Sequence, residues 1–275
     1  MANYTAADIK ALREKTGAGM MDVKKALDEA QGDQAKAVEI LRVKGLKGAT
    51  KREGRSTSDG LVAIKTDGGV GTMIEFNSET DFVAKSDKFI SLADEILELA
   101  VANNASDAEE FKNVEIDGKP VSQIITEGGA SLGEKVDLKK VVRLEGAKLA
   151  SYLHRTNKDL PPQVGVLLAY EGDNDQAAHD VAVHIAALAP KYFSREDVPA
   201  DLVEKEREIA LETAKNEGKP EAALPKIVEG RVNGFFKENV LLDQGFAKEP
   251  KKSVQSVLDE AGIKATGFAR VRVGA

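Results

Sequence analysis

A glycine-rich segment is the stretch whose residue types and spacing come nearest to a site for chemistry. Gly128 and Gly133 have the separation of the two outer glycines of a phosphate-binding loop. In that motif a lysine follows and reaches the phosphates, but here Glu134 holds the lysine's position and Lys135 comes one residue late. We therefore reject a nucleotide-binding loop in this segment.

Three histidines are the next candidates, as metal ligands or general bases. His179 and His184 are five residues apart, so on a helix they would project in different directions and would not share a metal. His154 lies in an expected strand of alternating character, where a structural histidine is the usual case. The absence of cysteine excludes disulfides, thiolate metal sites and a cysteine nucleophile. We expect no enzyme, no cofactor and no metal, and a hydrolase is the least favoured alternative.

The composition indicates a folded protein of the cytosol. With 275 residues and 42% hydrophobic side chains, the chain can form one large or two to three ordinary domains. No segment is long and apolar enough to cross a bilayer, and the first residues lack the pattern of a secretory signal. We therefore expect a cytoplasmic protein with no membrane partner.

The net charge of −7 is distributed unevenly. Residues 1–53 carry 11 Lys and Arg against 8 Asp and Glu, a net charge of +3, whereas the rest carries 28 against 38, a net charge of −10. A run of basic residues closes the first part and could contact nucleic acid or an acidic partner: Arg42, Lys44, Lys47, Lys51, Arg52 and Arg55. Because no aromatic residues are interleaved, a solvated linker is the better interpretation, and no direct nucleic-acid partner is expected.

Residues 1–53 are expected to form three short helices and a basic linker. Thr5 to Asp8 form an approximate capping box, and apolar residues recur at steps of three and four. Glycines should end the helices: Gly17 and Gly19, Gly32, and Gly45. Met20 is expected in the small core, whereas Met21, one helical step of about 100° away, suits a partner surface.

The remaining chain is expected to form an α+β core in two parts, residues 54–140 and 141–275. In each part strands precede a helix, which hints at two related halves. The first part opens with a hairpin turning at Asp67-Gly68 and continues with a helix from about Ser86. The second part has expected strands at 141–144, 149–154, 164–170 and 267–273, with helices at 176–188 and 253–261.

A long antiparallel helical hairpin is expected at about 198–238, inserted in the second part. Gly218-Lys219-Pro220 breaks it, and Pro225 should delay or kink the second helix. Such a hairpin is compatible with a homodimer.

Residues 77–85, Asn-Ser-Glu-Thr-Asp-Phe-Val-Ala-Lys, join the expected hairpin to the expected helix. Strand-to-helix junctions lie at the surface on rigid supports and often carry function. Local rules favour a structural role, in which Thr80 or Asp81 caps the turn while Phe82 and Val83 staple it to the sheet. The alternative is that Phe82 is displayed to a partner.

Several long motifs, in order, resemble the bacterial elongation factor Ts family, the guanine nucleotide exchange factors of elongation factor Tu. They are residues 12–27, the Thr-Asp-Phe-Val-Ala-Lys motif at 80–85, Tyr152 with His154, and Val-Glu-Gly-Arg at 228–231. The resemblance covers nearly the whole chain. It implies a UBA-like three-helix N-terminal domain, a core of two related α+β subdomains and an inserted antiparallel coiled-coil hairpin.

The resemblance also implies a function and contact residues. Asp81 and Phe82, flanked by Thr80 and Val83, would enter the GTPase near its magnesium and phosphate sites and promote GDP release, so that GTP can load. Arg13, Met20 and Met21 would meet the nucleotide-binding domain, and His154 another domain of the GTPase. The partner would be elongation factor Tu, nucleotide-free and GDP-bound, with no covalent chemistry. The alternative class is a UBA-like adaptor or chaperone-like scaffold whose hairpin mediates assembly.

Overall fold

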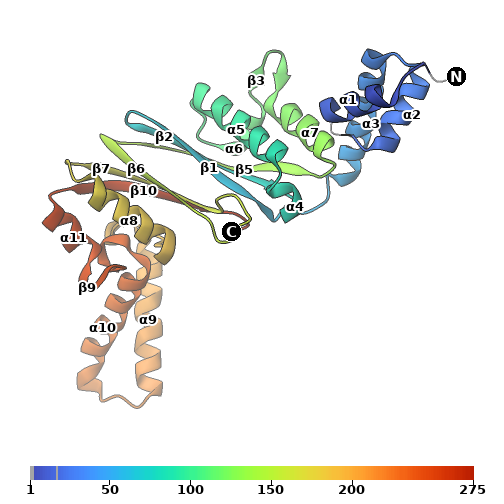
Figure 1. Ribbon diagram of the computed structural model, residues 1–275. Coiled ribbons are helices and arrows are strands. Elements are labelled where there is room, and N and C mark those ends of the chain that lie inside the picture. The colour runs from blue at the N-terminus through green and yellow to red at the C-terminus, as the bar shows by residue number, and fades with distance from the viewer. Residues whose placement is uncertain (1–2, 17) are drawn as a thin grey trace.

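The structure is a computed structural model that describes residues 3–16 and 18–275, and it has the expected mixture of helices and sheets. Two three-stranded antiparallel sheets pack face to face, and helices cover the outer face of each (Figure 1). A three-helix unit lies at one end, and a long helical hairpin extends from the other (Figure 1). No helix in the described part of the chain is long and apolar enough to cross a membrane.

The first sheet contains the expected hairpin, but the turn lies one residue later in the chain than expected. Its strand order is β1-β2-β5, with β1 Asp59–Asp67, β2 Val70–Ser78 and β5 Val136–Glu145. Asp67 pairs with Val70, so the turn residues are Gly68 and Gly69. Gly68 has a φ of +56°, a left-handed conformation that glycine adopts without steric cost.

The strand expected at 141–144 is only part of the longer strand β5. It begins five residues earlier, at Val136, and it pairs with β2 of the first sheet. The expected boundary between residues 140 and 141 therefore falls inside a strand. An apolar alternation predicts a strand but does not identify its neighbour, because pairing partners are distant in sequence.

The second sheet packs on the first where glycines allow close approach. Its order is β10-β7-β6, with β6 Lys148–His154, β7 Val164–Glu171 and β10 Lys264–Arg272. A Cβ atom on Gly165 would lie 2.5 Å from Val62 Cγ1, and one on Gly71 would lie 2.9 Å from Leu167 Cδ2. Such distances are shorter than van der Waals contact, so a side chain at either glycine would push the sheets apart.

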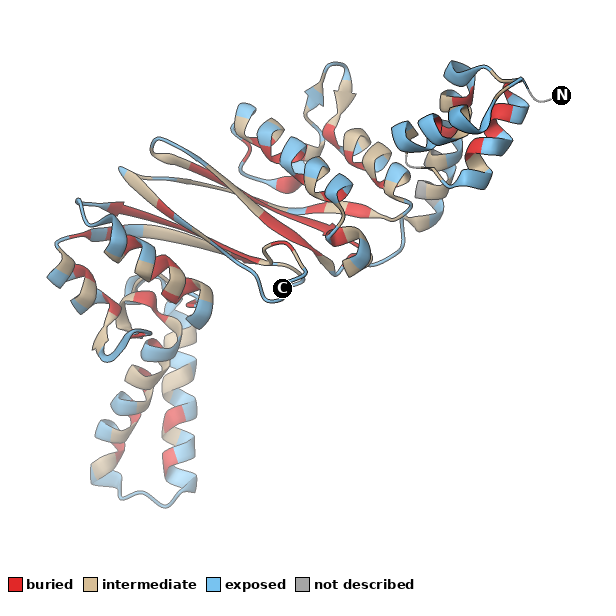
Figure 2. Ribbon diagram, viewed as in Figure 1, coloured by how far each residue is buried: buried red, intermediate tan, exposed pale blue. Residues whose placement is uncertain are grey.

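Helices bury the outer faces of both sheets (Figure 2). The first sheet is covered by α5 Asp87–Ala102, α6 Ala108–Lys112 and α7 Val121–Leu132, and the second by α8 Asp175–Leu188 and α11 Val254–Ala261. Phe76 of β2 stacks on Phe89 of α5 with ring centroids 5.1 Å apart, and both rings are fully buried. Short strands complete the body: β3 Glu115–Ile116, β4 Lys119–Pro120, β8 Gly245–Phe246 and β9 Glu249–Ser253.

The N-terminal unit contains α1 Ala6–Thr16, α2 Met20–Glu29 and α3 Gln34–Arg52. Its small core includes Leu12, Val23 and Leu27. The expectation that Met20 fills this core is wrong, since its side chain is 58% exposed and that of Met21 is 65% exposed. Helix α2 begins at Met20, about one turn before Val23, and Val23 is the first residue of this helix that is buried in the core. Gly17, expected to end the first helix, lies outside the described residues.

Helix α3 does not end at Gly45 as expected but continues to Arg52. A Cβ atom on Gly45 would lie only 3.1 Å from the Cβ of Ala130 in α7, so this glycine serves helix packing. Arg42 of α3 also pairs with Glu127 of α7. Part of the expected basic linker is therefore a helix that holds the three-helix unit on the core.

The helical hairpin consists of α9 Ala200–Asn216 and α10 Leu224–Asn239. Pro225 lies in the first turn of α10, where a proline is tolerated, so it stands at the start of the second helix and not inside it. Ion pairs join the two arms: Arg207 to Glu229, 2.6 Å, and Arg231 to Glu217, 2.7 Å. The UBA-like character of the N-terminal unit and coiled-coil packing in the hairpin stay predictions.

Buried His184 links α8 to the segment that follows the hairpin. Its Nδ1 accepts the backbone N–H of Ala247 at 3.1 Å, so Nε2 carries the proton and donates to Gln244 Oε1 at 2.9 Å. Burial lowers the pKa of His184 below its ordinary value of 6.5, against the raising effect of the Gln244 hydrogen bond. The neutral ring is therefore the native form.

We predict that acid destabilises the protein through His184. As the pH falls below 6.5, the unfolded chain binds a proton before the native one does, so stability is full above that pH and is lost toward the lower native pKa. The free energy of unfolding, measured with urea between about pH 5.5 and pH 7.5, should therefore fall on acidification. His184→Gln should lower it by about 1–3 kcal/mol at the higher pH and reduce its pH dependence.

The matched control is His179→Gln, because His179 lies on the same helix and is exposed. This control should keep the wild-type pH dependence. An equal slope in the His184 and His179 variants would contradict the assignment.

Candidate functional site

The junction after β2 is a tight corner made by two helix caps in series. Helix α4, Asp81–Ala84, follows Thr80, whose hydroxyl accepts the Val83 N–H at 3.4 Å. Ser86 then caps α5 by accepting the Phe89 N–H at 3.3 Å. We call residues 80–85 the corner, and its backbone direction is fixed at both ends by these caps.

Within the corner, Phe82 and Val83 have opposite environments. Val83 packs against the apolar core formed by the first sheet and its helices, as expected for a residue that anchors the turn. Phe82 has 74% of its surface exposed, so it does not staple the turn. The two residues follow one another in a helix and point in different directions, which separates the anchoring residue from the displayed one.

Lys85 contacts both Asp81 and Phe82. Its ammonium lies 3.6 Å from the Asp81 carboxylate and 4.5 Å from the centroid of the Phe82 ring. Ion pairs and cation–π contacts at exposed sites are each worth about 1 kcal/mol or less. Lys85 therefore orients Asp81 and Phe82 weakly enough for a partner to replace it.

The glycine-rich segment lies at the wrong end of a helix for phosphate binding. Gly128 is inside α7, and Gly133, with a φ of +79°, is the residue that ends it. A helix C-terminus carries partial negative charge and unpaired carbonyls, which repel anions. The rejection of a phosphate-binding loop is confirmed.

The same segment contains a serine in Gly-x-Ser-x-Gly spacing, from Gly129 to Gly133. In hydrolases that serine sits on a sharp turn between strand and helix. Here Ser131 lies in the last turn of α7, and its hydroxyl donates to the Gly128 carbonyl at 2.7 Å. The spacing alone therefore does not make a nucleophile.

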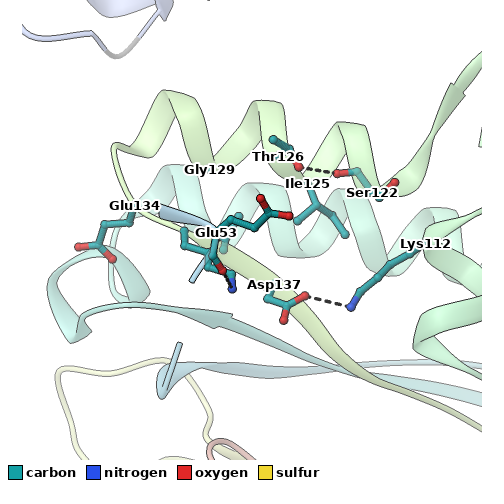
Figure 3. Close-up of a pocket in the computed structure, with 10 residues that line it drawn as sticks. Glu53, Lys112, Ser122, Ile125, Thr126, Gly129, Glu134 and Asp137 are labelled. Carbon is teal, nitrogen blue, oxygen red and sulfur yellow. Dashed lines mark hydrogen bonds and ion pairs between the residues drawn. The ribbon is translucent and has the colours of Figure 1, made fainter. Parts of the chain in front are cut away.

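A cavity of about 290 Å³ lies beside this segment, and two of the charged residues that line it, Lys112 and Asp137, form an ion pair. The Lys112 ammonium lies 3.0 Å from the Asp137 carboxylate (Figure 3). Burial alone would raise the pKa of Asp137, but hydrogen bonds from Lys139 and Lys112 outweigh it and hold the pKa below its ordinary value. Glu134 lies at one end of the cavity, apart from this pair (Figure 3). The two lysines therefore hold Asp137 in its ionised form.

His179 and His184 point in different directions, as their spacing predicts, whereas His154 and His179 both contact Tyr152. His154 is exposed at the end of β6, with Nδ1 3.2 Å from the Tyr152 hydroxyl, and His179 stands edge-on to the Tyr152 ring at 5.8 Å. His184 is buried, and its Nε2 is hydrogen-bonded to Gln244. Across residues 3–16 and 18–275, His, Asp and Glu side chains form no group of three or more arranged to hold a metal.

The expected contact residues stand on separate supports. Arg13, Met20 and Met21 are exposed on the three-helix unit, the corner lies on the first sheet, and His154 lies on the second. These supports are spread along the molecule (Figure 1), so only a macromolecular partner could touch all of them. Lys85 and Glu134 were not expected to support the corner. No local sequence signal indicates the contact between Glu134 and Thr80, because the two residues are 54 positions apart.

We predict that Phe82→Ala changes the free energy of unfolding by less than about 0.5 kcal/mol, because the ring is exposed. The matched variant Phe89→Ala should lower it by about 3–5 kcal/mol, since that ring is fully buried. Urea unfolding measures both values. A loss for Phe82→Ala as large as that for Phe89→Ala would restore the staple interpretation.

Comparison with known proteins places this geometry in a family. The family model described as "Elongation factor TS" matches residues 79–275, a range that includes the corner. Proteins named "Elongation factor Ts" are similar over the full length of both chains: 68% identical in Arthrobacter sp. (strain FB24), 67% in Pseudarthrobacter chlorophenolicus and 64% in Micrococcus luteus. The chain belongs to the elongation factor Ts family.

Proposed function

We propose that this chain promotes GDP release from the GTPase elongation factor Tu, so that GTP can load. Asp81 and Phe82 would enter the GTPase near its Mg²⁺ and phosphate sites. The observation that carries the proposal is the 74% exposure of Phe82 on a corner whose backbone is capped at both ends. A large apolar side chain held out on a rigid support is what an aromatic anchor for a pocket requires.

The proposed mechanism uses binding energy and no covalent chemistry. GDP is held through its phosphates and the metal, so a wedge that displaces the elements holding the metal weakens the nucleotide. The coupling is reciprocal: GDP must loosen the factor by the same ratio by which the factor loosens GDP. Typical couplings of about 1–3 kcal/mol correspond to roughly 5- to 150-fold, and efficient exchange requires more.

The other contacts would supply affinity for nucleotide-free and GDP-bound elongation factor Tu. Arg13, Met20 and Met21 would meet the nucleotide-binding domain, and His154 another domain. The exposure of the two methionines supports this role, since flexible thioethers suit a partner surface. The reaction would take place in the cytoplasm. A homodimer through the helical hairpin is a further proposal.

We predict that Phe82→Ala lowers the rate of GDP release at saturating factor by roughly 30-fold, as the loss of a ~2 kcal/mol anchor would. Stopped-flow measurement with a fluorescent GDP bound to elongation factor Tu gives the rate. The matched control is Leu188→Ala, which removes another exposed apolar side chain. Release at the spontaneous rate with saturating wild-type protein would instead indicate a binding adaptor.

The methionine pair should affect affinity more than rate. The double substitution Met20→Ala with Met21→Ala is expected to raise the factor concentration for half-maximal release by roughly tenfold, with little change in the maximal rate. Titration of the factor in the same assay separates the two quantities. Val43→Ala, an exposed position on α3, is the control, and an equal effect of that change would contradict a specific contact.

A further inference from the structure

At the base of the corner, two segments that are far apart in sequence are joined by hydrogen bonds in both directions. Each segment donates a backbone N–H to a glutamate carboxylate of the other. The Glu134 carboxylate accepts the backbone N–H of Thr80 at 3.0 Å and the Thr80 hydroxyl at 2.6 Å. In return, the Glu79 carboxylate accepts the backbone N–H of Lys135 at 2.6 Å. We call Glu79, Thr80, Glu134 and Lys135 the reciprocal clamp. Hydrogen bonds to ionised acceptors are roughly twice as strong as neutral ones.

Glu134 also decides what the Thr80 hydroxyl does. A hydroxyl has one proton to donate and two lone pairs that accept. Because the proton goes to Glu134, the oxygen is left to accept the Val83 N–H at 3.4 Å and so to cap α4. Glu134 therefore acts on both residues that flank Asp81 and Phe82.

The other half of the clamp is held in turn. Arg55 donates to the second oxygen of Glu79 at 2.9 Å, and the Lys135 ammonium donates to the Arg55 carbonyl at 3.1 Å. Burial alone would raise the pKa of Glu79, but the Lys135 N–H and Arg55 outweigh it and hold the pKa below its ordinary value. The Glu79 carboxylate of the clamp therefore stays ionised at neutral pH.

We propose that Glu134 is a positioning residue that fixes the direction and rigidity of the Asp81-Phe82 pair. Its part in exchange rests on the proposed function, whereas its part in ordering the corner does not. Gly133, with its left-handed φ of +79°, ends α7 immediately before Glu134 and turns the chain toward Thr80. Glu134 is half-buried at the surface and stands outside the cluster of buried apolar residues below it, so its loss removes the clamp without opening the core.

The first test follows amide hydrogen exchange by NMR and needs no GTPase. In Glu134→Ala, the Thr80 amide loses its acceptor and Val83 loses an oriented cap, so both amides should exchange roughly tenfold faster at an unchanged thermal midpoint. Glu134→Gln keeps one acceptor oxygen and should give an intermediate increase. Glu95→Ala, an exposed carboxylate on α5, is the matched control and should leave both amides as in wild type. Unchanged exchange in Glu134→Ala would overturn the proposal.

The second test is a double-mutant cycle on GDP release from elongation factor Tu. Glu134→Ala should lower the maximal release rate by roughly tenfold, because the Asp81-Phe82 pair is no longer held in position, and should lower it by less when Phe82→Ala is present, since only Asp81 is then left to misplace. An equal loss with and without Phe82, or a change in half-saturating concentration alone, would show that Glu134 acts by another route and would overturn the proposal. If Phe82→Ala itself leaves release unchanged, the proposed function fails, while amide exchange still decides whether Glu134 orders the corner.

Discussion

The close packing of the two sheets is the constraint on which the rest of the structure depends. At Gly71 and Gly165 the sheets approach more closely than any side chain would allow, and the Val62 N–H donates across to the Pro162 carbonyl at 2.8 Å. One sheet ends in the corner and the other in His154, so this packing sets the distance between two surfaces that the proposed partner would touch together. Interiors packed at such density transmit strain and do not deform gradually. The spacing of the contact residues is therefore a property of the core.

The elements themselves were largely predictable from local pattern. Hydrophobic periodicity and capping residues located the helix after Ser86, the helical hairpin and most strands, because those signals act over a few residues. Two of the errors have a common origin in contacts between distant segments. Gly45 looked like a helix end but is a packing position against Ala130, and the strand at 136–145 joined the sheet that its position in sequence did not suggest.

The corner shows the same limit at finer scale. Local rules describe Thr80 and Val83 correctly as cap and anchor, but they assigned Phe82 the same anchoring role. Only the three-dimensional arrangement separates the exposed ring of Phe82 from its half-buried neighbour Val83, and only family resemblance suggests what the exposed ring does. Glu134 was beyond sequence reasoning altogether, because nothing in a carboxylate after Gly133 points to a threonine 54 residues away.

The strand order of the second sheet has a consequence for how the chain folds during synthesis. Strand β7 lies in the middle of that sheet, yet its neighbour β10 follows the whole α9–α10 insertion in sequence. Contacts of such high sequence separation form slowly, whereas the three-helix unit consists of local contacts and can form as soon as it leaves the ribosome. Until β10 arrives, one edge of β7 is unpaired, and an open apolar edge invites association with other chains. The hairpin insertion therefore sets the length of time for which the nascent chain is most prone to aggregate.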